Sequence, residues 1–506
     1  MSTKAYRKYR GLLIVLCAAV LVAGFAGCDS DQAEQAAKPR SRAVINAGEI
    51  VPAEEVRVAE YLQYYDQHFP EPQNSAVGLD LRLGNSVVPS EGGMVWLQIG
   101  LQTKSDQTES VSPLNLAIVI DRSGSMADDD KMPYLKQSLN MFLQSLNSND
   151  IVAVVTYNDR AEVLVPAQML GSGHRIQQMI DSIQPGGATN LHAGMMLGFE
   201  EVNKNYDIRR NNRVILLTDG IANRGITDPQ QIAVDALAYN NKGIYLGTIG
   251  LGLEFNDSLL SQLADQGQGG YTFVDSTREM ERIFREHVSG LTQRVASDVE
   301  IKVIPQQGVR LVGLTGFKGS PPTAGASIPL WPLGTGDSAV VLAELQAGAG
   351  STGYRPLATV ELEYFDEFAQ RTVSTRQTIG AEMVSNMSRY NPTWDLEIYR
   401  NVTIQRTAEA MKEIDRLFDG EKYEEAWRIA VDLEQQLNEV ASLTGDSQIS
   451  EDAALMRKYQ QTLAEAVWQM EGRSPWEDEG MPQADYNDRP YRGYTPTPNV
   501  PEIKID

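Results

Sequence analysis

The sequence predicts an α/β unit with a mostly parallel sheet, inserted in or flanked by a β-sandwich and followed by C-terminal helices. Two patterns predict this fold class. Between residues 114 and 296, short runs rich in Val, Ile and Leu alternate with segments of helical periodicity. On both sides of that stretch, apolar and polar residues alternate between turns that contain Gly and Pro, which is typical of antiparallel strands.

The expected strands of residues 114–296 are nearly continuous apolar runs, as strands covered on both faces must be. Between the first two runs, Leu135, Leu139, Phe142 and Leu146 form one helical stripe. Alternation of this kind predicts a sheet with helices on both faces. The strands are expected at Leu116–Ile120, Ile151–Tyr157, Val214–Leu217, Ile244–Ile249 and Tyr271–Val274, and the further helices at His174–Ile183, Leu191–Val202, Pro229–Tyr239, Ser258–Ala264 and Arg278–Val295.

The flanking segments are expected to form one β-sandwich. Residues 46–113 hold a predicted helix, Pro52–Tyr65, and two strand-like runs, Val77–Leu83 and Met94–Leu101, which lack partners of their own. We expect them to pair with strands of residues 297–382, which makes the α/β unit an insertion. The strands expected there include Val299–Ile304, Ser338–Glu344 and Ala358–Tyr364.

The C-terminal part is predicted to be helical over residues 393–471, with breaks near Gly420 and at Thr444–Ser450. A plain helical hairpin is favoured over a repeat array, because only one segment resembles a repeat turn. Residues 472–506 are rich in Pro, acids and Tyr, a composition that predicts disorder.

The N-terminus has the pattern of an export signal, predicted over residues 1–27. A basic stretch precedes the apolar run Gly11–Ala26, which is shorter than the ~20 residues of a spanning helix. The run ends in Phe25-Ala26-Gly27-Cys28, which resembles the lipobox of bacterial lipoproteins and implies lipidation at Cys28. Residues 28–45 are then expected to be a flexible tether, and the protein to be lipid-anchored in the cell envelope, facing the periplasm or the cell exterior. An ordinary secretory signal and an uncleaved anchor are the alternative interpretations.

The net charge of −23 bears on the class of partner. A surface this acidic repels nucleic acid and anionic lipid headgroups. A role in nucleic-acid binding is therefore not expected.

Three separated motifs place oxygen-bearing side chains at or beside the ends of predicted strands. They are Asp121-Arg122-Ser123-Gly124-Ser125, Gly186-Gly187-Ala188-Thr189-Asn190 and Leu216-Leu217-Thr218-Asp219-Gly220. Loops at the carboxyl ends of parallel strands converge on one crevice, so these motifs are expected to meet. The predicted ligands are Asp121, Ser123, Ser125, Thr189 and Asp219. Oxygen-only ligation favours Mg²⁺, or Mn²⁺ and Ca²⁺, over zinc.

These motifs resemble the metal-ion-dependent adhesion site of von Willebrand factor type A domains, and the resemblance covers residues 114–296. It implies that one carboxylate acts through water and that an acidic side chain of a partner protein completes the coordination of the metal ion. The whole arrangement also resembles bacterial lipoproteins with a von Willebrand-associated N-terminal segment. That second likeness rests on Asn46-Ala47-Gly48-Glu49-Ile50-Val51-Pro52 and on a helix that follows it from Val56 to Pro70.

An enzymatic function is not expected. The histidines His68, His174, His192 and His287 are scattered without zinc-like spacing, and no Gly-x-Ser-x-Gly elbow or P-loop is present. The leading hypothesis is a metal-dependent protein-binding module. The alternative is an envelope assembly factor whose C-terminal helices bind the partner while the metal site is mainly structural. The acidic run Asp128–Asp130 is either a second cation site or, as favoured, an exposed loop before a helix.

Overall fold

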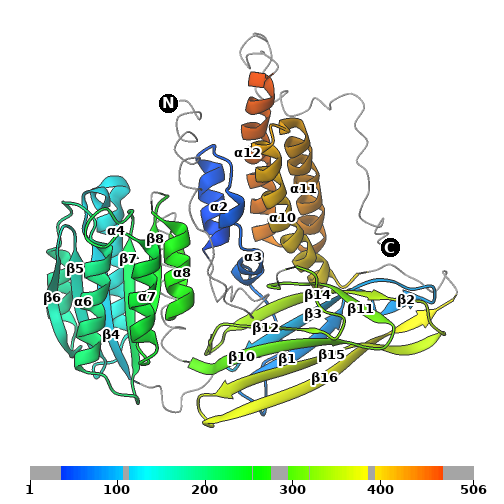
Figure 1. The fold of residues 1–506 in the computed structure, drawn as a ribbon, viewed down its shortest axis with the longest axis horizontal. Helices are drawn as coiled ribbons and strands as arrows, with labels where there is room; N and C mark the ends of the chain where they lie inside the picture. Colours follow the sequence, from blue (N-terminus) through cyan, green and yellow to red (C-terminus); the bar gives the residue numbers. More distant parts are fainter. Residues whose placement is uncertain are drawn as a thin grey trace, which may run out of the picture.

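The computed structural model describes residues 36–105, 113–253, 255–274, 294–317, 319–385 and 394–470. Figure 1 shows an α/β unit beside a β-sandwich, with long helices standing on the sandwich and two short helices in between. The predicted fold class is confirmed. The predictions for the signal peptide, Cys28 and the tail lie outside the described residues, as do residues 278–293 of the helix predicted at Arg278–Val295. Within the described ranges, no helix combines the length and apolarity needed to cross a membrane.

The α/β unit is built on one twisted sheet with the strand order β6-β5-β4-β7-β8-β9. All neighbours in it are parallel except β5 and β6. The strands are β4 (Leu114–Asp121), β5 (Ile151–Tyr157), β6 (Ala161–Met169), β7 (Asn211–Thr218), β8 (Tyr245–Leu251) and β9 (Gln268–Val274). The helices are η3 (Gly124–Asp130), α4 (Lys131–Ser145), α5 (His174–Asp181), α6 (Leu191–Lys204), α7 (Pro229–Asn240) and α8 (Asp257–Gly267).

Alternate residues of the central strand enter two different cores. Leu116, Ile118 and Ile120 of β4 pack in the core beneath α4 and α5. Ala117 and Val119 of the same strand pack in the core beneath α6, α7 and α8. Both faces of β4 are therefore buried, which explains why its sequence is an uninterrupted apolar run.

Strand β6 is the element of this sheet that the sequence did not predict. It forms a hairpin with β5 at the sheet edge, and its residues are mostly half-buried or exposed. It also contains Pro166, which is tolerated at an edge where no ladder partner needs its missing N–H. An edge strand with one proline lacks the apolar run that identified the other strands.

The β-sandwich confirms that the α/β unit is an insertion. One sheet has the order β1-β3-β14-β11, so strands from before and after the insertion pair directly. The other has the order β12-β10-β15-β16-β2, with β13 paired to β10. The strands are β1 (Val77–Leu83), β2 (Val87–Pro89), β3 (Gly93–Thr103), β10 (Arg294–Pro305), β11 (Val309–Leu314), β12 (Ala326–Pro329), β13 (Leu333–Gly334), β14 (Ser338–Ala347), β15 (Gly353–Asp366) and β16 (Arg371–Val384). Since β10 begins at Arg294, residues 294–296 belong to the sandwich rather than to the α/β unit.

The C-terminal helices pack on the outer face of the first sandwich sheet. They are α10 (Leu396–Asp419), α11 (Tyr423–Thr444) and α12 (Ser447–Met470), with breaks where the sequence predicted them. Leu97, Ile99 and Val341 point into the sandwich, whereas Trp96, Val340 and Leu342 pack with the helices. Buried Asn401 of α10 also donates to Gln98 Oε1 of β3 at 2.8 Å. The helices and the sandwich therefore form one continuous structure.

The prediction of a flexible tether over residues 28–45 is wrong for residues 37–45. These residues belong to helix α2 (Ala37–Asn46), in which even Lys38 and Arg40 are buried. Their charges are compensated by residues distant in the sequence, such as Asp452 of α12, which lies 2.5 Å from Lys38 Nζ. A polar composition near the N-terminus predicts disorder only when such partners are absent.

The helix predicted at Pro52–Tyr65 is divided into η2 (Ala53–Glu55) and α3 (Val58–Tyr64). Val56 and Arg57 between them have extended backbone angles. Gln63 of α3 exchanges hydrogen bonds with the backbone of Val340 in β14. Helices α2 and α3 thus lie between the α/β unit, the sandwich and the C-terminal helices, as Figure 1 shows.

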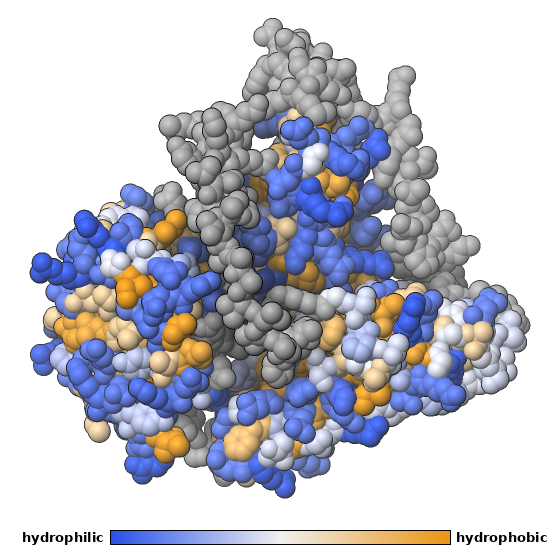
Figure 2. Space-filling model, in the orientation of Figure 1, coloured by the Kyte–Doolittle hydropathy of each residue, from blue (hydrophilic) through white to orange (hydrophobic). Residues whose placement is uncertain are grey.

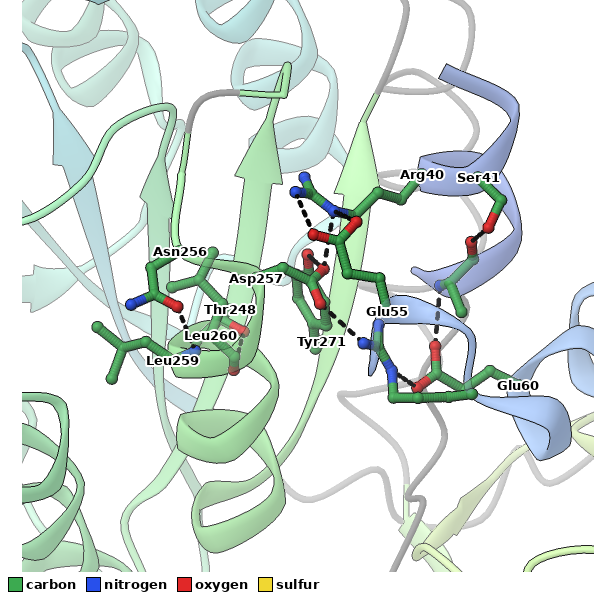
Figure 3. A network of polar contacts seen from close by, with 12 residues as sticks. Arg40, Ser41, Glu55, Glu60, Thr248, Asn256, Asp257, Leu259, Leu260 and Tyr271 are labelled. Atoms are coloured by element: carbon green, nitrogen blue, oxygen red, sulfur yellow. Dashed lines mark hydrogen bonds and ion pairs between the residues drawn. The ribbon is translucent and has the colours of Figure 1, made fainter. Parts of the chain in front are cut away.

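A buried ionic network joins α2 and α3 to the α/β unit (Figure 3). Asp257, at the start of α8, lies 3.4 Å from Arg40 Nε and accepts a hydrogen bond of 2.8 Å from Arg57. Tyr271 of β9 donates to the same carboxylate at 2.6 Å. Burial and the charge of Asp257 raise the pKa of Tyr271 well above its usual value, so its hydroxyl remains a donor. Glu55 also pairs with Arg40, through Nε at 2.8 Å and Nη2 at 3.1 Å.

We predict that Asp257→Asn destabilises the protein, because it leaves Arg40 and Arg57 buried without their shared anion. Breaking a buried ion pair typically costs about 3–5 kcal/mol. Thermal unfolding should show a lower melting temperature for the variant. In limited proteolysis, the protease should cut within residues 36–70 faster in the variant than in the wild type. Asp207→Asn is the matched control, since Asp207 pairs with Arg209 at the surface and its loss should leave the melting temperature unchanged. Equal melting temperatures for both variants would contradict the assigned role of Asp257.

Candidate functional site

The candidate site lies where two neighbouring parallel strands end. Asp121 is the last residue of β4, and Asp219 directly follows Thr218, the last residue of β7. Because Ile120 pairs with Leu217 in this parallel ladder, the two carboxylates leave the same edge of the sheet side by side. This is the crevice position expected for a ligand site in an open α/β sheet.

Backbone hydrogen bonds join the first motif to the second. Gly124 N–H donates to the Gly187 carbonyl at 3.0 Å, and Gly186 N–H donates to the Arg122 carbonyl at 2.7 Å. The amide of Asn158 adds a hydrogen bond of 2.7 Å to the Gly186 carbonyl. The two loops are therefore held together without help from a ligand.

A second set of hydrogen bonds joins the motif of Thr189 to the loop after β7. Thr189 N–H donates to Asn223 Oδ1 at 2.9 Å, and the Thr189 carbonyl accepts from the backbone N–H groups of Asn223 and Arg224. A Cβ added at Gly220 would lie 3.4 Å from Thr189 Oγ1 and 3.7 Å from Ser125 Oγ. Those two hydroxyls therefore face the same small space, and the absence of a side chain at Gly220 keeps it open.

Asp121 is fully buried and is held by two hydrogen bonds. Its Oδ1 accepts from the Ser123 backbone N–H at 2.8 Å, and its Oδ2 accepts from the Thr218 hydroxyl at 2.8 Å. Burial raises the pKa of Asp121 to about 6, although the hydrogen bonds from Ser123 and Thr218 oppose the rise. Among the described residues, no basic side chain forms an ion pair with Asp121.

Asp219 is equally buried but has a cationic partner. Its Oδ1 accepts from the Ser125 hydroxyl at 2.8 Å, and its Oδ2 lies 2.8 Å from Nζ of Lys131 at the start of α4. Ser125 Oγ is also 3.1 Å from Ser123 Oγ. Four of the five predicted residues thus form one cluster of direct contacts, and Thr189 borders it across Gly220.

The donor set of this cluster fits a hard divalent cation. It offers carboxylate and hydroxyl oxygens only, which are the ligands that Mg²⁺, Mn²⁺ and Ca²⁺ take in preference to zinc. Each oxygen of Asp121 keeps accepting capacity beyond its one hydrogen bond. A buried carboxylate without a basic partner gains most from a bound cation, because desolvation disfavours its charged form.

Other residues that the sequence singled out lie apart from this cluster. His192, in the first turn of α6, contacts Asp235 of α7 at 2.8 Å. Arg122 pairs with Glu162 of β6 at 2.9 Å, so its charge is partly compensated. Asp128 and Asp130 are exposed in η3 and at its end, in agreement with the favoured interpretation of an exposed loop.

Sequence reasoning missed Thr218, Lys131 and Asn223. Thr218 was inside a motif but was not recognised as the donor to Asp121. For Lys131 the sequence carried a signal, since a lysine at the first position of a helix opposes the helix dipole and therefore suggests an anionic partner. Nothing in the sequence around Asn223 indicated its contact with Thr189, because that contact depends on how the loop after β7 folds back.

Comparison with known proteins identifies relatives of the α/β unit. Residues 115–286 match the family model described as von Willebrand factor type A domain. Uncharacterized protein YfbK of Escherichia coli (strain K12) is 28% identical over 269 residues, which cover 52% of this chain and 47% of that protein. The match therefore spans about half the length of that relative. Uncharacterized protein sll0103 of Synechocystis sp. is 24% identical over 321 residues, or 60% of this chain and 74% of that protein.

A solved structure, described as von Willebrand factor type A from Catenulispora acidiphila, resembles more than the α/β unit. The superposition covers 76% of this chain and 91% of that one, with a TM-score of 0.50 and 16% sequence identity. At this level of identity the likeness concerns the fold. It extends beyond residues 115–286, so the wider arrangement of the chain has a counterpart among solved structures.

We predict that Gly187→Ala disturbs the loop that carries Thr189. Gly187 has φ +96°, and an added Cβ would lie 2.5 Å from Asp159 Oδ2 and 2.9 Å from Asn158 Nδ2. Strain of this kind costs about 1–3 kcal/mol. The variant should have a lower melting temperature and a lower affinity for Mn²⁺ than the wild type. Gly171→Ala is the control, because Gly171 has φ +58° with nothing within 4 Å, and it should affect Mn²⁺ binding little. An equal loss of Mn²⁺ binding in both variants would refute the role given to Gly187.

Proposed function

We propose that this protein, which contains a von Willebrand factor type A domain, is a metal-dependent binding module that captures a carboxylate-bearing partner protein. The supporting observation is the cluster of oxygen ligands at the carboxyl edge of β4 and β7. Domains of this family commonly bind a divalent ion at this position and commonly mediate protein interactions. Mg²⁺ is the proposed ion, with Mn²⁺ and Ca²⁺ as substitutes.

The residues proposed to hold the ion are Asp121, Ser123, Ser125, Thr189 and Asp219. Their hydroxyls are neutral, and one of their two carboxylates, Asp219, is already paired with Lys131. The protein therefore compensates the ion's charge only in part. A bound Mg²⁺ supplies an electrophilic position at which an oxygen ligand exchanges with water. The backbone hydrogen bonds between the three loops hold the ligands in place beforehand, which lowers the ordering cost of binding.

The surface next to the cluster is suited to a protein partner. Apolar patches interrupt the hydrophilic surface of the α/β unit in Figure 2. In the loop after Asp219, the side chains of Ile221 and Ile226 are 58% and 39% exposed. Arg224 lies between them in sequence and is 3.7 Å from Asp159 at the surface. An acidic residue with an adjacent aliphatic side chain would match this combination of charge and apolar surface.

We also propose that the protein is lipid-anchored through Cys28 and acts in the cell envelope, on the strength of the sequence pattern that ends at Cys28. No catalytic step is proposed. The oxygen cluster has a cation-binding role that accounts for both serines, and His192 is engaged with Asp235 away from it. Binding through the C-terminal helices is the competing function that the following experiment separates.

We predict that a partner from a native envelope extract binds the full-length chain in Mg²⁺ and is released by EDTA. Asp121→Ala should abolish capture, because it removes the buried carboxylate that pairs with no basic side chain among the described residues. Capture is measured by affinity purification and mass spectrometry, with Mn²⁺ restoring binding after EDTA. Asp207→Ala, a surface carboxylate in the same domain, serves as the control. If the same partners are captured in EDTA and by Asp121→Ala, the metal site is not the binding site, and the C-terminal helices become the favoured one.

We further predict that Ile221→Asp lowers affinity for the metal-dependent partner at least about tenfold, since it places a like charge against an acidic ligand and removes apolar contact. The measurement is titration of the purified partner in Mg²⁺. Ile208→Asp is the control, because Ile208 is 85% exposed in the loop before β7, whereas Asp219 follows the opposite end of that strand. Equal affinities of the two variants would place the interface elsewhere on the domain.

A further inference from the structure

The ion pair between Lys131 and Asp219 gives the candidate metal site a cation of its own. Asp219 has no exposed side-chain surface, and Lys131 is 16% exposed. The lysine Nζ lies 2.8 Å from Asp219 Oδ2, while Ser125, a proposed metal ligand, occupies Oδ1. One carboxylate of the site is therefore compensated by a lysine, whereas Asp121 has no ion-pair partner in the part of the chain that the structure describes.

The fold makes room for this lysine. Lys131 is the first residue of α4, where the helix dipole is unfavourable for a cation. Its side chain passes Gly252, which follows β8 and has φ +75°, and a Cβ there would lie 3.3 Å from Lys131 Cε and 3.6 Å from Nζ. The side chain thus extends along the carboxyl edge of the sheet, next to the metal ligands. A cation in this place needs an anion, and Asp219 provides it.

We propose that the ammonium group of Lys131, by pairing with Asp219, lowers the affinity of the site for divalent metal ions. In the absence of metal, Lys131 holds the buried carboxylate of Asp219. When a divalent ion binds beside Asp219, the ammonium group repels it, because two like charges then share one low-dielectric site. Lys131 therefore weakens metal binding and stabilises the protein without metal.

The same lysine favours a carboxylate ligand. Two carboxylates and one ammonium leave one net negative charge at the site. A divalent ion then gives the site one net positive charge, whereas without Lys131 the loaded site would be neutral. This consequence rests on the function proposed above. Lys131 lowers the affinity of the site for the metal ion, and it raises the attraction of the loaded site for an anionic partner.

The test is Mn²⁺ binding to the full-length protein, followed by electron paramagnetic resonance and by calorimetry. Lys131→Met should bind Mn²⁺ more tightly, on the order of tenfold, and Lys131→Arg should match the wild type. Lys136→Met is the matched control. Its ammonium lies on the same helix but bonds the carbonyls of Asp181 and Ile183, so its loss should leave Mn²⁺ affinity unchanged. Lys131→Gln, which keeps a hydrogen-bond donor for Asp219, replaces Lys131→Met if that variant does not fold.

A second readout is the stability change on metal addition. Metal-free Lys131→Met should melt below the wild type, and Mg²⁺ should raise its melting temperature more than that of the wild type, as linkage requires for tighter binding. If Lys131→Met, or Lys131→Gln in its place, binds Mn²⁺ equally or more weakly than the wild type, while Asp121→Ala has lost binding, this inference is overturned and the proposed function stands. Failure of every protein to bind Mn²⁺ overturns both.

Discussion

The carboxylate of Asp257 determines how the α/β unit sits on the rest of the protein. It is 5% exposed and lies between Arg40 and Arg57, which come from the N-terminal segment. Burying these charges is favourable only in the one arrangement that pairs all of them, and any other arrangement leaves a charge desolvated and uncompensated. The main effect of the network is therefore to select one orientation of the α/β unit, and its net contribution to the free energy of folding is small. Helices α2 and α3 transmit that orientation, because they are packed in the core of the C-terminal helices.

The candidate site is separate from this anchoring network. Asp257 and Tyr271 belong to α8 and β9, whereas the site is formed at the ends of β4 and β7. Within the described residues, the hydrogen bonds and ion pairs of the three site motifs stay inside the α/β unit. One edge of the domain is thus used for fixing its position, and the loops that carry Asp121, Thr189 and Asp219 remain available to a partner.

Much of this arrangement could be predicted from the sequence, for a physical reason. Strands buried on both faces, such as β4, need continuous apolar residues, and ligands at strand ends appear as short motifs directly after those runs. What could not be predicted depends on contacts between distant residues. Helix α2 looks like a tether because the sequence does not reveal its anionic partners. Lys38 pairs with Asp452, and Arg40 pairs with Glu55 and also approaches Asp257, more than two hundred residues away. The same holds for Lys131, whose pairing with Asp219 requires α4 to begin beside the end of β7.

The charges of the site favour the proposed reversible capture of a partner over permanent storage of a metal ion. A site built to retain a divalent ion would surround it with carboxylates, which compensate its charge and leave little attraction for a further anion. Here one buried carboxylate, Asp121, lacks a basic partner among the described residues, and the other, Asp219, already has Lys131. The remaining proposed ligands are the hydroxyls of Ser123, Ser125 and Thr189, which would coordinate an ion without neutralising its charge. An ion held in this way keeps excess positive charge in a buried environment, where an incoming carboxylate interacts more strongly than it would in water.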